Sequence, residues 1–161
     1  MVALPDRILI IGNSGSGKST LARAISDRHQ HPFIGLDQIH WGEGGFAQKR
    51  DEQVARRLTR DAATAARWVM EGVYGWLSDE AVPRVQTLLW LDLPWAECRA
   101  GLLERKADQS FDAEMLLWAE QYWTRETSSS FAGHRRLYDD FARDKLRFQS
   151  REEVAAFMAR L

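Results

Sequence analysis

The chain has 161 residues, of which 45% are hydrophobic and 28% are charged, and its formal net charge is -1. This length and balance predict one globular domain, residues 1–161, with a core of its own. A net charge near zero argues against a dedicated nucleic-acid-binding protein, although a local basic patch stays open.

The single cysteine, Cys98, has no partner for an internal disulfide, so we expect a reducing, cytoplasmic location. The first seven residues are too short and polar for a signal peptide, and the apolar run 8–11 is too short to span a bilayer. No repeat or linker divides the chain, and no pattern specifies an oligomeric state.

A strand over Arg7–Ile11 is followed by Gly12–Ser19, which fits the phosphate-loop pattern G-x-x-x-x-G-K-[ST], and then by a helix from Lys18 to about His29. Loop amides and the helix N-terminus can hold phosphate oxygens, Lys18 can reach the β- and γ-phosphates, and Ser19 can bind Mg²⁺. The less favoured interpretation of this segment is a Gly/Ser-rich turn without a function in phosphate binding. The expected nucleotide-contacting residues are Gly12, Asn13, Ser14, Gly15, Ser16, Gly17, Lys18, Ser19 and Thr20.

A second strand is predicted over Phe33–Asp37, ending in a carboxylate. Ligands of open parallel sheets bind outside the carboxyl ends of strands, so Asp37 can orient or deprotonate a phosphate-accepting hydroxyl. The alternative is a helix-capping or turn carboxylate. His40 and Trp41 are candidates for the acceptor pocket, with a structural role for His40 equally open. A flexible loop is expected at 42–45.

An Ala-rich helix over Lys49–Arg67 leads to a third strand, Trp68–Gly72, which again ends in a carboxylate. Glu71 can hold a Mg²⁺-bound water or polarise the acceptor, or it can be structural. Segment 72–75 forms a tight exit, where Gly72 would let the backbone approach a ligand and Tyr74 would lie beside the acceptor. A short helix or turn over 76–83 precedes Arg84, a phosphate clamp or a surface charge.

The strand Thr87–Leu91 ends at Asp92, a weak Walker-B-like pattern that makes Asp92 a candidate metal ligand. A helix over 96–106 buries Cys98 and ends near Arg105, which we expect to close over the transferring phosphate.

Segment 106–140 is the expected lid. A helix over 108–127 has an aromatic-rich face that either belongs to the core or hinge of the lid or stacks on an acceptor ring. After a polar break at 127–130, one of Arg135 or Arg136 is expected at phosphate, and Arg125 is less favoured. A strand over Lys145–Phe148 and a helix capped by Ser150 close an α/β alternation, which predicts a parallel sheet.

Three segments resemble the adenylate-kinase-related P-loop kinases known as DNA topology modulation proteins. They are the phosphate loop 11–21, Leu36–Trp41 and Trp68–Tyr74, and Leu89–Pro94 is similar to the next strand of that group. The resemblance implies a three-layer P-loop NTPase fold with five parallel strands in the order 2-3-1-4-5, helices on both faces and a helical lid. It also implies ATP at Gly12–Thr20, an acceptor between Asp37 and Glu71, and lid arginines after the fourth strand.

The sequence departs from that group at Glu71, where the group carries Asp, and at Val73, where it carries Asn. It also lacks the acceptor arginine and the D-G-F-P-R-like strand end of nucleoside monophosphate kinases, and the full acceptor signatures of shikimate and gluconate kinases. The prediction is therefore a kinase that uses ATP and Mg²⁺ on a nucleotide, nucleoside or hydroxylated metabolite. The alternative is a nucleotide-binding regulatory or nucleic-acid-associated protein with slow ATPase activity.

Overall fold

The computed structural model describes residues 3–42, 48–105 and 113–161. One sheet has the strand order β2-β3-β1-β4-β5, and every pairing in it is parallel. This confirms the predicted sheet and its order. The strands are β1 (Arg7–Gly12), β2 (Phe33–Gly35), β3 (Trp68–Glu71), β4 (Thr87–Leu91) and β5 (Asp144–Phe148).

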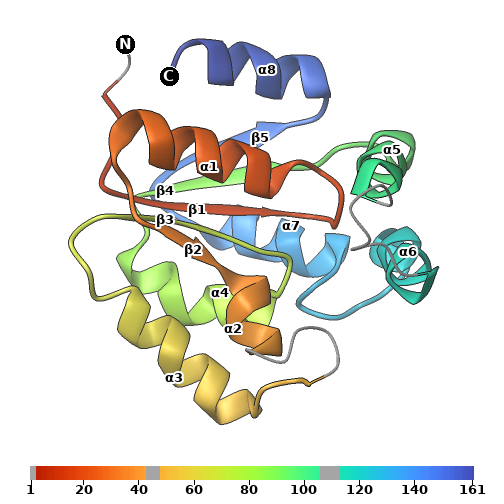
Figure 1. Cartoon of the computed structure of the whole chain (residues 1–161), viewed down its shortest axis with the longest axis horizontal. Helices are drawn as coiled ribbons and strands as arrows, with labels where there is room; N and C mark the ends of the chain where they lie inside the picture. The colour runs from red at the N-terminus through yellow and green to blue at the C-terminus, as the bar shows by residue number, and fades with distance from the viewer. Residues whose placement is uncertain (1–2, 43–47, 106–112) are drawn as a thin grey trace.

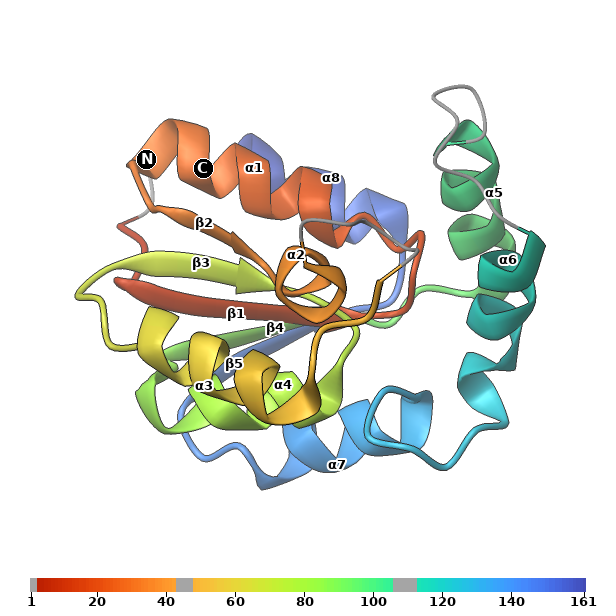
Figure 2. The same ribbon diagram turned by 60° about the horizontal axis from the view of Figure 1, so that its bottom comes forward.

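Helices cover both faces of the sheet and extend beyond one end of it. One face carries α1 and α8, the other carries α3, α4 and α7 (Figure 1), and α5 and α6 lie beyond the carboxyl ends of the strands (Figure 2). The helices are α1 (Lys18–His29), α2 (Leu36–Trp41), α3 (Glu52–Ala62), α4 (Gly75–Ala81), α5 (Trp95–Arg105), α6 (Ala113–Glu120), α7 (Phe131–Asp140) and α8 (Arg151–Ala159), with 3₁₀ turns η2 (Val82–Arg84) and η4 (Gln121–Trp123).

The central strand β1 is apolar on both sides because it faces two separate cores. Ile8 and Ile10 pack with Leu21 and Ile25 of α1, whereas Leu9 and Ile11 pack in the cluster that α4 and α7 cover. The sequence of a strand that is buried on both faces is continuously apolar, as residues 8–11 are here. The phosphate loop therefore begins from a fixed strand end.

Several element boundaries differ from the prediction. β2 ends at Gly35, so that Asp37 lies in α2 instead of closing a strand. α3 begins at Glu52 because the Asp51 side chain caps it, accepting from the Val54 N–H at 3.1 Å. The predicted helix 108–127 is seen as α6 and η4. Residues 106–112, like 43–45 of the expected flexible loop, lie outside the described residues.

The helix α7 occupies a segment where the sequence predicted the returning arm of a lid. The Ser130 hydroxyl caps it by accepting from the Gly133 N–H at 3.4 Å. Phe131, Leu137 and Tyr138 then pack against the core cluster that contains β1 and β4. Segment 131–140 is thus a layer of the core.

His134 fixes α7 through a buried chain of hydrogen bonds. Its Nε2 lies 2.8 Å from the Val73 carbonyl oxygen and donates to it, and its Nδ1 lies 2.7 Å from the Tyr122 hydroxyl. The neutral ring carries its proton on Nε2, so the Tyr122 hydroxyl donates to Nδ1, and it accepts from the Trp90 indole N–H at 3.3 Å. Burial lowers the pKa of His134 to about 3, so the ring is neutral in the folded chain.

Across the described residues, no helix combines the length and the apolar character that crossing a membrane requires.

Candidate active site

The phosphate loop leaves β1 and reaches α1 through glycines with left-handed backbone. Gly15 has φ +82° and Gly17 has φ +95°, a region that other residues enter at a cost. Gly15 also needs to lack a side chain, because a Cβ there would lie 2.2 Å from the Cys98 carbonyl oxygen of α5. The loop therefore rests directly on α5.

Lys18 is buried at the start of α1, and its Nζ donates to the Asn13 carbonyl at 2.7 Å. Burial lowers its pKa, while the negative charges of Glu71 and Asp37 oppose that shift. The buried Ser16 hydroxyl finds no hydrogen-bond partner in the part of the chain that the structure describes. A buried cation beside an unsatisfied donor and the start of a helix is suited to an anion.

Ser19 and Glu71 meet at the carboxyl ends of β1 and β3. The Ser19 hydroxyl donates to Glu71 Oε1 at 2.9 Å. Burial raises the pKa of the Glu71 carboxyl, and the nearby charge of Lys18 lowers it. A hydroxyl next to a carboxylate is a donor set that suits Mg²⁺. Among the described residues, no group of three or more His, Cys, Asp or Glu could hold a metal, so an ion here would also need nucleotide or water ligands.

Asp92, the other predicted metal ligand, is engaged elsewhere. Its Oδ2 accepts from Arg147 Nε at 3.0 Å and from Arg147 Nη2 at 2.6 Å. Arg147 reaches it because β5 runs parallel to β4, with Trp90 opposite Arg147 in the register. Asp92 thus joins β4 to β5, whereas Glu71 is the carboxylate that contacts Ser19 of the phosphate loop. Metal binding by Asp92 stays a prediction.

A cavity of about 620 Å³ opens beside the phosphate loop. Its walls combine aromatic rings with charged and hydroxyl side chains, within the size range of small-molecule sites. The residues that line it are Ser14, Asp37, His40, Trp41, Lys49, Tyr74, Trp76, Arg105, Glu114, Met115, Trp118, Arg125, Thr127, Ser128 and Ser129.

Asp37 reaches this cavity from the first turn of α2. Tyr74 lies close to Asp37. Burial raises the pKa of the Tyr74 hydroxyl, and the nearby Asp37 charge raises it further. The same hydroxyl accepts from the Trp41 indole N–H at 3.0 Å. His40 stacks on Tyr74 with ring centroids 4.0 Å apart, and burial lowers the pKa of His40. The structure thus brings together Asp37, His40, Trp41 and Tyr74.

Gly72 has a packing role that the sequence did not indicate. A Cβ at this position would lie 2.5 Å from the Cβ of Leu36, the first residue of α2. The missing side chain allows α2 to pack on the end of β3, and hence positions Asp37. The approach of a ligand to the Gly72 backbone stays a prediction.

Two of the predicted arginine sites lie away from the cavity. Arg84 is exposed in η2, and its carbonyl accepts from Arg7 Nε at 2.7 Å at the amino end of β1. This is the end of the sheet opposite the phosphate loop, because α4 runs back along the sheet before η2. Arg135 and Arg136 are exposed on α7. Arg135 pairs with Asp139 at 3.6 Å, and of the described residues those lining the cavity include neither Arg135 nor Arg136. Their expected contact with phosphate stays a prediction, which the lining of this cavity does not support.

Two other arginines do line the cavity, Arg105 from α5 and Arg125 after η4. The charge of Arg105 lowers the pKa values of both Lys18 and Glu71, which places it near the phosphate loop. Arg125 lies over the Trp118 ring, 3.9 Å from its centroid, and donates to the carbonyls of Trp118 and Ser129. The sequence gave little indication that Arg125 would line the cavity. Arg125 differs from Arg135 and Arg136 of α7 in its burial, which the sequence pattern around residues 127–130 does not reveal.

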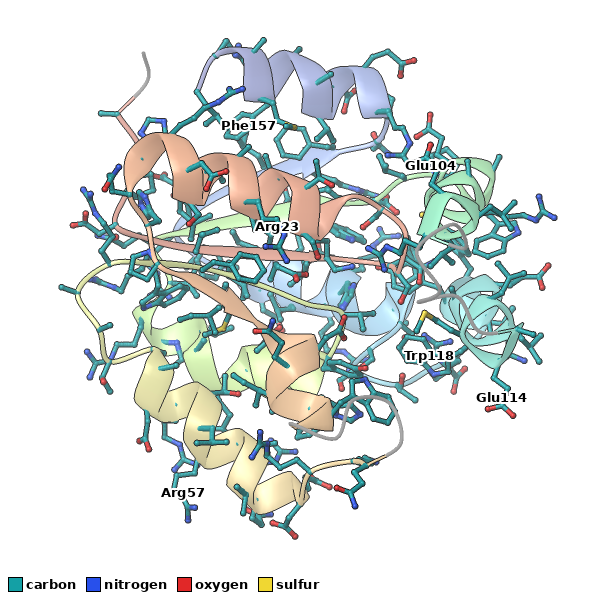
Figure 3. The ribbon with its side chains drawn as sticks, in the orientation of Figure 1. Arg23, Arg57, Glu104, Glu114, Trp118 and Phe157 are labelled. Carbon is teal, nitrogen blue, oxygen red and sulfur yellow. The ribbon has the colours of Figure 1, made fainter. Side chains whose placement is uncertain are left out.

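The loop and the cavity wall are connected by Asn13. Its Nδ2 donates to the Ala119 carbonyl of α6 at 2.9 Å, and its Oδ1 accepts from the Ser14 N–H at 2.8 Å. Figure 3 shows Trp118 of α6 on the side of that helix that faces the rest of the molecule.

No family model matches the chain. The uncharacterized protein YqaC of Bacillus subtilis (strain 168) is 30% identical over 139 residues, which cover 85% of this chain and 75% of YqaC. The chain belongs to the YqaC family. A shorter match, 30% identical over 83 residues, joins the chain to the ATP-dependent protease ATPase subunit HslU of Borreliella burgdorferi, of which it spans 18%.

Solved structures place the YqaC family chain in the P-loop kinase fold. A gluconokinase from Sinorhizobium meliloti 1021 aligns over 99% of this chain and 94% of its own, with a TM-score of 0.59 and 15% identity. A shikimate kinase from Acinetobacter baumannii, in complex with shikimate, aligns over 96% and 91%, with a TM-score of 0.59 and 14% identity. At these identities the likeness is one of fold.

Proposed function

We propose that the chain is an ATP-dependent kinase that transfers the γ-phosphoryl group to a hydroxyl of a small-molecule acceptor. The observation that carries the proposal is the cavity of about 620 Å³ with Asp37 in its wall, directly beside a complete phosphate loop. As part of this proposal we assign the chain to the DNA topology modulation type of kinase and to the cytoplasm. Both assignments rest on the sequence alone.

The nucleotide half of the site is formed by the loop amides, Lys18 and Ser19. The loop and the α1 N-terminus hold the phosphates, and the Lys18 ammonium neutralises the β- and γ-oxygens. Ser19 and Glu71 are the residues that would hold Mg²⁺, which supplies further neutralisation of phosphate charge when bound. Glu71 also keeps the Ser19 hydroxyl oriented, through the 2.9 Å hydrogen bond.

In the transfer step, the acceptor hydroxyl oxygen forms a bond to the γ-phosphorus. The bond from that phosphorus to the β–γ bridging oxygen breaks, and ADP leaves with the electron pair. The hydroxyl proton passes to the Asp37 carboxylate. Arg105 and Arg125, in place of Arg135 and Arg136, supply positive charge in the wall of the cavity. Positioning and electrostatics account for most of the rate enhancement in such a reaction.

The test separates nucleotide binding from turnover. Lys18→Met should abolish both ATP binding and phosphoryl transfer. Asp37→Asn should lower turnover by about 100-fold or more, the usual effect of losing a general base, and leave ATP affinity within about twofold because Asp37 lies on the acceptor wall. Asp27→Asn, at an exposed position of α1, is the matched control. Wild-type turnover in Asp37→Asn would refute the role of Asp37.

A further inference from the structure

We propose that the acceptor carries a planar heteroaromatic ring, as nucleosides do, and that this ring inserts between Tyr74 and Trp118. The inference rests on the proposed function, because it names the class of molecule that the same cavity accepts. It stands on the geometry of the two rings and of the groups behind them.

Tyr74 and Trp118 both line the cavity, and they come from different parts of the fold. Their ring centroids are 6.3 Å apart and their planes are inclined by 36°. A third ring in contact with both at about 3.5 Å requires a separation of about 7 Å. The two rings would need to part by at least about 0.7 Å and to turn toward parallel, which a rotation of the Trp118 side chain would provide.

Each ring also has a fixed neighbour. His40 stacks on Tyr74 at 4.0 Å and 20°, and the Trp41 indole N–H holds the Tyr74 hydroxyl at 3.0 Å. Arg125 lies 3.9 Å from the Trp118 centroid and is itself held by the carbonyls of Trp118 and Ser129. Tyr74, held in this way, loses little freedom when a ligand arrives.

The position of Arg125 favours a heteroaromatic ring over a sugar face. A sugar presents C–H groups with partial positive charge, which prefer the electron-rich face of an aromatic ring. The guanidinium on one side of Trp118 draws π-electron density toward itself. The Trp118 ring therefore becomes a poorer partner for C–H groups and a better one for an electron-rich ring.

The remaining walls fit the rest of such a molecule. Asp37, Arg105 and Ser14 line the same cavity, and the charges of Asp37 and Arg105 both act on Lys18 of the phosphate loop. A hydroxylated arm attached to a clamped ring can thus extend toward Asp37 and the transferring phosphate. The volume of about 620 Å³ leaves room for a ring and an arm together.

The test is a set of dissociation constants measured by calorimetry, with Mg²⁺ and a non-hydrolysable ATP analogue filling the phosphate loop. Adenosine, guanosine, cytidine and thymidine are compared with gluconate and shikimate. At least one nucleoside should bind ten times more tightly than either hydroxy acid. Trp118→Leu should weaken that binding by roughly 5- to 150-fold, the range for losing one stacked aromatic ring. Trp118→Phe should retain most of it.

Trp123→Leu is the matched control, because Trp123 is a partly exposed tryptophan of η4 that is not among the described residues lining the cavity. Its nucleoside affinity should equal that of the wild type, and circular dichroism should show each variant folded. Nucleosides that bind no more tightly than the hydroxy acids, or do not bind, overturn the inference. Phosphorylation of a hydroxy acid in preference to nucleosides also overturns it and leaves the kinase proposal standing. Trp118-dependent nucleoside binding without any phosphoryl transfer supports the clamp and refutes the proposed function.

Discussion

Gly72→Ala tests whether this glycine serves the packing of α2 or the approach of a ligand. The added Cβ would lie 2.5 Å from Leu36 Cβ and 2.8 Å from Leu36 Cδ1. Ordinary contacts between carbon atoms need about 3.5–4.0 Å. The helix α2 would have to move by about 1 Å, or Leu36 would have to leave its rotamer.

Overpacking of this kind typically costs about 1–3 kcal/mol. We therefore expect the free energy of unfolding of Gly72→Ala to fall by about 2 kcal/mol, measured by urea denaturation. Turnover should also fall, because α2 carries Asp37 and a displacement of about 1 Å can cost 10²-fold. ATP affinity should change little, since Lys18 and Ser19 lie on α1.

The reasoning is checked by a double-mutant cycle with Leu36→Ala. Leu36 is fully buried in the core, so Leu36→Ala alone should be destabilising, by about 2–5 kcal/mol. In that background the new Cβ has space, and Gly72→Ala should cost about 1 kcal/mol less than in the wild type. Equal costs of Gly72→Ala in the two backgrounds would refute the packing role of Gly72.

Three further outcomes follow from the described contacts. Arg84→Ala should leave turnover and ATP affinity unchanged and alter the free energy of unfolding by less than about 0.5 kcal/mol, because Arg84 is exposed at the far end of the sheet. Burial raises the pKa of the Cys98 thiol to about 11, so iodoacetamide at pH 8 should modify native protein about 100-fold more slowly than urea-unfolded protein. The pKa of His134 is about 3 when folded and 6.5 when unfolded. Between those values only the unfolded chain binds the proton, so the free energy of unfolding should fall by about 1.4 kcal/mol for each pH unit below 6.5, and His134→Gln should remove that part of the pH dependence.

Each of these has a contradicting result. A large loss of turnover in Arg84→Ala would return Arg84 to the phosphate site. Rapid alkylation of native Cys98 would show that the packing of α5 against the phosphate loop opens readily. Parallel pH profiles for wild type and His134→Gln between pH 5 and 6.5 would show that the buried ring is not held neutral.

The features that the sequence predicted correctly are those determined by the residues within one short segment. The phosphate loop follows from the motif around Gly12–Ser19, and the sheet follows from apolar runs such as Leu9–Ile11 and Thr87–Leu91. Glu71 was placed correctly at a strand end because parallel strands bring their carboxyl ends to one edge.

The surroundings of three other candidate residues depend on distant contacts. Arg84 depends on the direction of α4, Asp92 on the register of β5, and Gly72 on a side chain 36 residues earlier. The helix α7 carried a local signal, since Phe131, His134, Leu137 and Tyr138 follow helical spacing behind a capping serine. The basic residues Arg135 and Arg136 in the same segment favoured its interpretation as part of a lid.

The most direct test of the central claim is phosphorus NMR of the purified protein with ATP, Mg²⁺ and a panel of nucleosides, nucleoside monophosphates, sugars and hydroxy acids. The account predicts that one acceptor yields a new phosphate ester signal with ADP in equal amount, and that Asp37→Asn suppresses it while still binding ATP. Inorganic phosphate as the only new product, at a rate that no acceptor changes, would contradict a kinase and favour a nucleotide-binding regulator with slow ATPase activity.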